Sequence, residues 1–228
     1  MAPEEDIHNS NIDVFVELED SRSYTTYIAT PNNHYWIMEN NGMDYFCGCP
    51  FVLAKSLAHD NIERALTAYS KDDAYWLKYY YSIGVTKINE LNKIVKQSFN
   101  SPILKENVKI KNIIYPVPLS EIEDITIGNI DVFVQMQDGL TYVIDVATPS
   151  YYYRHMEKQR LDYYCGRPAI LVKGLTHDNI ERALTDCTGF DAYKLKCYHM
   201  AGIIEIGELD KVLDESFREH EEFFDDFE

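Results

Sequence analysis

The sequence predicts an α+β protein made of two tandem homologous domains, each a small antiparallel sheet with helices packed on it. The main observation is an internal repeat: residues 11–100 align without a gap with residues 129–218, and 44 of the 90 aligned pairs are identical. The offset of 118 residues is far longer than a solenoid period, so each copy is expected to be a domain. We therefore divide the chain into repeat one (residues 1–100), a linker (101–128), repeat two (129–218) and an acidic, aromatic tail (219–228).

Each repeat is predicted to open with a β-hairpin followed by a short helix. Apolar and polar residues alternate over Ile12–Leu18, which is typical of a half-buried strand, and Tyr24–Ala29 returns after a turn. Thr30 and Pro31 then have the residue types of a helix N-cap and first helical position. The helix should run to about Asn41, and repeat two should follow the same order.

The middle of each repeat contains a string of nine residues, HDNIERALT, at His59–Thr67 and again at His177–Thr185. An apolar run before it, Phe51–Leu57 in repeat one, predicts another strand. Within the string, Asp60 suits an N-cap and Glu63 falls three residues later, as in a capping box. The string is therefore predicted to be a helix start with a structural purpose.

The end of repeat one contains two more helical patterns, Asp73–Ile83 and Ile88–Phe99. The linker that follows is rich in proline and includes the alternating stretch VKIKNIIYPV, which can add an edge strand to a sheet. The two domains together are expected to form a pseudo-dimer within one chain, and the sequence leaves further oligomerisation open.

Charge and composition narrow the class of protein. The formal net charge is −17, and Glu205–Glu228 alone contributes −9 of it, which argues against a nucleic acid as the partner. The sequence lacks a run of the roughly 18 apolar residues needed to span a membrane, and its start is acidic where a secretion signal is basic. These features predict a cytoplasmic protein without a membrane partner. The five cysteines show no CxxC spacing, so we expect reduced, mostly buried thiols.

Two residue pairs are candidate sites of chemistry. His59 and Glu63, like His177 and Glu181, lie one helical turn apart, a spacing that could hold a metal or pair a base with an acid. Two ligands are too few for zinc, and Glu63 already has the predicted capping role. Cys47 and its equivalent Cys165 are expected to be packed in the core. We therefore predict no catalytic residue, no cofactor and no metal.

An acidic surface is the predicted site of partner binding. In repeat two the last helical pattern keeps its apolar stripe and gains acids, which should lie on the exposed side. The tail adds further acids. The three consecutive tyrosines of Tyr79–Tyr81 and of Tyr151–Tyr153 cannot all face one core from a helix, so some of these rings should lie at a surface. Partner binding would explain such exposed tyrosines, and so would packing between the repeats. The predicted partner-binding residues are Glu205, Glu208, Asp210, Asp214, Glu215, Glu221, Glu222, Asp225, Asp226, Tyr151 and Tyr152.

The hairpin of repeat one, VFVELEDSRSYTTYIAT, resembles a loose group of short bacterial proteins that begin V-x-L-E-D-G-R-x-Y. The matching residues are Val16, Leu18, Glu19, Asp20, Arg22 and Tyr24, with Ser21 in place of glycine; repeat two keeps Val134, Asp138, Gly139 and Tyr142. More broadly, a small, acidic, duplicated α+β protein is similar to immunity proteins of bacterial toxin systems. That resemblance implies a non-enzymatic protein that neutralises a basic toxin, with a nuclease as the expected toxin. The alternative is a regulatory or structural interaction module, in a phage or plasmid defence context.

Overall fold

The computed structural model describes residues 6–19, 21–46, 48, 50–99 and 109–225, and it confirms the α+β class. Repeat one contains β1 (Asn11–Glu17), β2 (Ser23–Ala29), α1 (Pro31–Asn40), β3 (Tyr45–Phe46), β4 (Val52–Ala54), α2 (His59–Tyr69), α3 (Lys71–Val85) and α4 (Ile88–Phe99). The linker contributes β5 (Ile110–Ile114) and a short 3₁₀ helix (Leu119–Glu121). Repeat two contains β6 (Asn129–Met136), β7 (Thr141–Ala147), α5 (Pro149–Gln159), β8 (Tyr163–Tyr164), β9 (Ile170–Val172), α6 (His177–Cys187), α7 (Gly189–Met200) and α8 (Ile206–Asp225).

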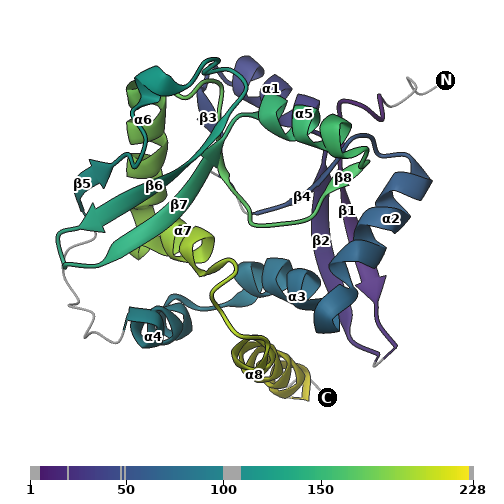
Figure 1. Ribbon diagram of the computed structural model, residues 1–228. Helices are drawn as coiled ribbons and strands as arrows, with labels where there is room; N and C mark the ends of the chain where they lie inside the picture. The colour runs from purple at the N-terminus through teal and green to yellow at the C-terminus, as the bar shows by residue number, and fades with distance from the viewer. Residues whose placement is uncertain (1–5, 20, 47, 49, 100–108, 226–228) are drawn as a thin grey trace.

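The two repeats exchange strands, so that each sheet contains strands of both (Figure 1). One sheet has the order β1-β2-β4-β8, in which β8 comes from repeat two and pairs through Leu53 and Tyr164. The other has the order β3-β9-β7-β6-β5, in which β3 comes from repeat one and pairs through Phe46 and Leu171. These two pairings are equivalent under the offset of 118, so the exchange is reciprocal.

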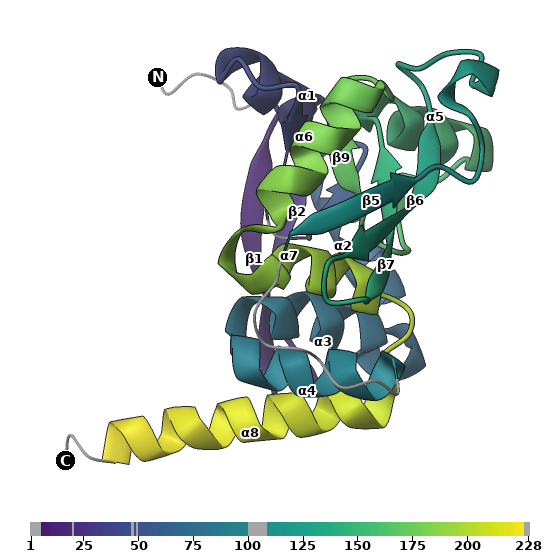
Figure 2. The same cartoon turned by 90° about the vertical axis from the view of Figure 1, so that its left-hand side faces the viewer.

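The last helices of the repeats are exchanged as well. Helix α8 of repeat two packs on α3 of repeat one, and α4 of repeat one packs on α7 of repeat two. Figure 2 shows α8 as a long rod along the edge of the molecule, with its C-terminal end reaching past the other helices. Tyr79 of α3 donates a hydrogen bond to the carbonyl oxygen of Cys197, which fixes α3 to α7. The pseudo-dimer is thus intertwined, and α8 belongs structurally to the side of repeat one.

The prediction of purely antiparallel sheets is wrong, because both sheets are mixed. β2 pairs with β4 in parallel, and β7 pairs with β9 in parallel. The cause is the helix between the paired strands: a strand that returns after a crossover helix runs in the same direction as the first. The N-cap of that helix was predicted correctly, since the Thr30 hydroxyl oxygen accepts a hydrogen bond from the Asn33 backbone N–H.

The capping box predicted within the nonamer is also wrong. Helix α2 begins at His59, one residue before Asp60, and its N-cap residue Ala58 makes no side-chain cap hydrogen bond. In repeat two the equivalent N-cap is Thr176, whose hydroxyl oxygen accepts from the Asn179 backbone N–H at 3.2 Å. The helices of the two identical strings are therefore capped differently.

The nonamer holds the two repeats together through its arginine. Arg64 lies 2.8 Å from the Asp162 carboxylate of repeat two, and Arg182 lies 3.2 Å from the Asp44 carboxylate of repeat one. The backbone supports the same contact, since the N–H of Lys55 donates to the Asp162 carbonyl at 2.7 Å. The reciprocal ion pairs give the string a structural role in both copies.

The apolar interior is shared between the repeats. The larger cluster lies between the sheets and the helices that cover them, and a smaller one combines Phe51 and Leu53 with Tyr152 and Leu171. In the nonamer helices, Ile180 is fully buried whereas Ile62 is half-buried. No helix in the described part of the chain is long and apolar enough to cross a membrane.

The cysteines do not all behave as predicted. Cys187 is buried and disulfide-bonded, so the expectation of reduced thiols throughout is wrong. Cys197 is free and buried, whereas Cys165 is free and exposed, contrary to the expectation of a packed core residue. Cys47 and Cys49 lie outside the described residues. The exposure of Cys165 follows from its place at the end of β8, an edge strand of its sheet.

Candidate functional site: an acidic face on helix α8 and strand β1

Helix α8 and Glu205, the residue just before it, present several of the predicted acidic residues to solvent. Glu205 and Glu215 are exposed, and Glu208 is half-buried. None of these three carboxylates has an ion-pair partner among the described residues. Uncompensated charges on one surface produce a field that attracts cations over about a Debye length. These residues fit the predicted binding role.

Asp210 has a different role, which corrects its assignment to the partner-binding surface. Its carboxylate lies 2.8 Å from the Nζ atom of Lys78, whose side chain is only 4% exposed. Lys78 also contacts Asp73 at 3.0 Å. Because α8 crosses to repeat one, the side of the helix that carries Asp210 faces α3, and the Asp210 side chain is only partly exposed. Asp210 therefore fixes α8 in place and is not available to a partner.

Asp214 joins α8 to the hairpin of repeat one. Its carboxylate lies 3.5 Å from Arg22, in the turn between β1 and β2, and both side chains are partly exposed. Glu17 at the end of β1 and Glu19 just after it are exposed as well. We use the term acidic face for the exposed or half-exposed acids of α8 and of this hairpin: Glu17, Glu19, Glu205, Glu208, Asp214 and Glu215. Both repeats contribute to it because the last helices are exchanged.

The tail residues lie mostly beyond what the structure describes. The backbone of α8 continues as helix through Asp225, so the segment predicted as a separate tail extends the helix. The side chains of Glu221, Glu222 and Asp225 and the whole of Asp226 lie outside the described residues.

The tyrosines predicted to bind a partner occupy other positions. Tyr152 is 1% exposed and its ring packs edge-on against Tyr164 at 4.6 Å, so its assignment as a binding residue is wrong. Tyr151 is half-buried in the same cluster. The exposed member is Tyr153, which lines a groove of about 500 Å³ between α1 and α5 together with Tyr35. Tyr35 and Tyr153 are identical residues at equivalent positions, which is the sequence feature that could have found this groove.

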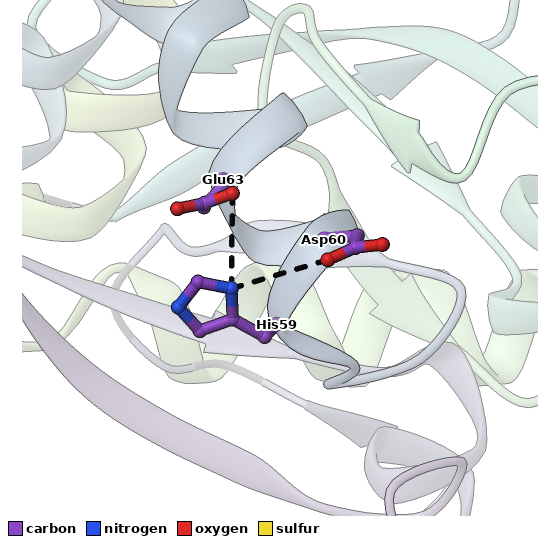
Figure 3. A group of neighbouring side chains, drawn as sticks. All are labelled: His59, Asp60 and Glu63. Carbon is purple, nitrogen blue, oxygen red and sulfur yellow. Dashed lines mark ion pairs between the residues drawn. The ribbon is translucent and has the colours of Figure 1, made fainter.

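The histidine and acids of the first nonamer form a small exposed cluster (Figure 3). The Nδ1 atom of His59 lies 3.7 Å from Glu63 and 4.0 Å from Asp60. Repeat two does not reproduce this arrangement, since the ring of His177 packs edge-on against Tyr115 at 4.7 Å. All three side chains lie on one helical turn in solvent, where carboxylates gather without a metal, so we assign no metal or acid–base role to them.

Burial shifts the pKa values of His34 and Asp145. His34 is fully buried and stacks on Phe51 at 3.8 Å, and burial lowers the pKa of its imidazole to about 3. Burial raises the pKa of Asp145 on β7 to about 7, with the nearby Asp131 acting in the same direction. Both groups are thus held neutral by the fold over part of the pH range, which makes stability depend on pH.

Comparison with protein-family models, curated proteins and solved structures found no match for this chain. The acidic face combines an excess of negative charge with elements from both repeats.

Proposed function

We propose that this chain is a non-enzymatic binding protein of the immunity type, which neutralises a basic protein toxin through its acidic face. A nuclease is the expected toxin class, because proteins that bind nucleic acid carry basic surfaces. The observation that supports this proposal most is the set of carboxylates on α8 without ion-pair partners among the described residues. Opposite charges on two proteins accelerate their association and help to exclude other partners.

The local arrangement supports protein binding through this face. Ion pairs with Lys78 and Arg22 hold the acidic helix against repeat one. A helix that is fixed in this way presents its remaining carboxylates in one orientation, so little conformational entropy is lost when a partner binds. The basic groups of the toxin that normally contact phosphates would then be covered by carboxylates.

The experiment compares two variants with the same change in net charge. One replaces Glu205, Glu208 and Glu215 with glutamine. The control replaces Asp60 with asparagine and Glu63 and Glu181 with glutamine, three exposed acids of the nonamer helices. The parent chain should retain a basic protein during purification, and that protein should be toxic to cells when it is expressed without the chain.

The expected result is that the α8 variant slows association with this protein by about tenfold at low salt and loses protection of the cells, whereas the control keeps both. Equal behaviour of the two variants would show that only net charge matters and would contradict the proposed site. A retained protein that is neither basic nor toxic would contradict the immunity role.

The groove between α1 and α5 supports the second candidate function, a regulatory or structural interaction module. Its exposed aromatic residues Tyr35 and Tyr153 are typical of protein interfaces. Tyr153→Ala should abolish binding under this second candidate and leave it unchanged under the first.

The proposal places the encounter in the cytoplasm, and the Cys187 disulfide provides a check on that compartment. Disulfides are rare in a reducing cytoplasm. Thiol labelling of freshly lysed cells under denaturing conditions measures how much of Cys187 is oxidised there. A fully oxidised Cys187 in cells would argue for another compartment.

A further inference from the structure

Strand β1 is an open edge of its sheet, whereas the equivalent strand of repeat two is covered. β6 pairs on one side with β7 and on the other with β5 from the linker. β1 pairs with β2, and no strand among the described residues pairs with its other side. β5 has no counterpart among the described residues of repeat one, so the two repeats differ at this edge.

The open edge exposes apolar side chains that are covered in repeat two. Ile12 is 43% exposed, whereas its equivalent Ile130 is 7% exposed. Phe15 is 79% exposed, whereas its equivalent Phe133 is half-buried. An exposed phenylalanine in the middle of an edge strand is costly in water and is typical of a surface that another chain covers.

The backbone groups of the open edge can be identified from the covered one. The N–H of Gln137 donates to the carbonyl of Lys109 beside β5, whereas the N–H of Met136 donates to Leu140 on the β7 side. Successive residues of a strand point their backbone groups in opposite directions. The equivalent alternation in β1 leaves the N–H and C=O groups of Asp13, Phe15 and Glu17 on its open side.

The charges beside this edge favour a basic strand as the occupant. Asp13 and Glu17 are exposed along β1. The strand that covers the equivalent edge, β5, carries the exposed Lys111, and the exposed Lys109 lies just before it. A second copy of β1 would bring its own Asp13 and Glu17 against these acids, and like charges on paired strands are destabilising. The edge also ends at the acidic face, because Glu17 precedes the turn in which Arg22 contacts Asp214.

We propose that the basic protein partner adds a β-strand to the open edge of β1, with alternating lysine and apolar residues as in β5. The partner strand pairs with Phe15–Leu18, the residues equivalent to Phe133–Met136 that pair with β5. Main-chain hydrogen bonds give the affinity, and the acids beside the strand select basic side chains. This inference rests on the proposed function and names the part of the partner that is bound.

The experiment uses the full chain and a peptide with the sequence of residues 109–115, KIKNIIY, as a surrogate for the partner strand. Binding is followed by the amide NMR signals of the chain, and a charge-reversed peptide, EIENIIY, is the control. The expected result is protection of the Phe15 and Glu17 amides, weaker binding at high salt, and binding of the reversed peptide weaker by at least about tenfold.

Two variants of Glu17 distinguish the contribution of the backbone N–H to peptide binding from that of the carboxylate charge. Glu17→Pro removes an outward N–H that the β1–β2 ladder does not use, and the fold should remain intact because proline is tolerated in edge strands. Because a partner strand would lose a hydrogen bond to this N–H, binding should fall by roughly tenfold. Glu17→Gln keeps this N–H and should weaken binding only about twofold. Equal binding by the parent chain and Glu17→Pro would overturn the proposal, as would protection confined to the α1–α5 groove.

Two further outcomes are informative about the occupant. A dimer of the parent chain in sedimentation experiments that becomes a monomer in Glu17→Pro would show that a second copy covers the edge, and would contradict a partner strand. The peptide could fail to bind while the variant with glutamine at Glu205, Glu208 and Glu215 no longer retains the basic protein. That combination would refute the strand addition and leave the proposed function intact.

Discussion

Replacement of Asp210 tests whether α8 is held on repeat one. Lys78 is almost fully buried, with its Nζ atom 2.8 Å from Asp210 and 3.0 Å from Asp73. Removing one partner of a buried ion pair costs about 3–5 kcal/mol, and Asp73 keeps one contact, so Asp210→Ala should lower the free energy of unfolding by about 3 kcal/mol. Repeat one has asparagine at the equivalent position, where Asn92 accepts a hydrogen bond from Lys196 at 2.6 Å. Asp210→Asn should therefore cost only about 1 kcal/mol.

The assay is urea unfolding followed by tryptophan fluorescence, because Trp76 lies on α3, the helix that contacts α8. Asp214→Ala is the matched control: it removes a partly exposed ion pair with Arg22 and should cost less than about 1 kcal/mol. Equal and small effects of Asp210→Ala and Asp214→Ala would refute the docking of α8 through Lys78. The result also decides which acids of α8 can be replaced in binding experiments, because reversal of the charge at Asp210 would release α8 from α3.

Three further predictions concern stability. Ala58→Thr should add about 1 kcal/mol in thermal unfolding by supplying the missing N-cap, and Thr176→Ala should lose a similar amount; no change in either would contradict the capping difference. The pKa of Asp145 is about 7 in the folded chain, above its ordinary value in the unfolded chain, so the folded chain binds this proton more tightly. The resulting contribution to the free energy of unfolding is fully present below about pH 4 and is lost as the pH rises through 7. Asp145→Asn should then unfold like the parent at pH 4 and be more stable at pH 8, by on the order of 3–4 kcal/mol, whereas an equal gain at both pH values would refute this cause. Ile180→Ala should cost about 3 kcal/mol and Ile62→Ala about half of that in urea unfolding, in keeping with their burial; equal costs would contradict it.

Local patterns in the sequence predicted most helices and long strands. The threonine N-cap of α1 and the bounds of α4 follow from residue types and hydrophobic spacing within a single segment. The exchange of strands could not be predicted in this way. β3 and β8 have two residues each, too few to show a period, and their choice of sheet is decided by contacts between the repeats.

The candidate site was predicted only in part for the same reason. The exposed acids of α8 follow from a helical pattern with one apolar stripe, and the structure places Glu205 and Glu215 in solvent. Asp210 looked equivalent to them because the pattern of α8 does not show which helix packs against it. Its partner Lys78 comes from the other repeat, and a buried lysine has no distinctive sequence signature.

Amide hydrogen exchange of the full chain, alone and mixed with the basic protein that it retains, tests the central claim most directly. The claim is that the partner binds to strand β1 and the adjoining acidic face. In the free chain, the amides of Phe15 and Glu17 should exchange rapidly, whereas those of Phe133 and Gln135 should be protected by β5. Addition of the partner should protect Phe15 and Glu17. Strong protection of these two amides in the free chain, or protection by the partner confined to α1 and α5, would contradict the account.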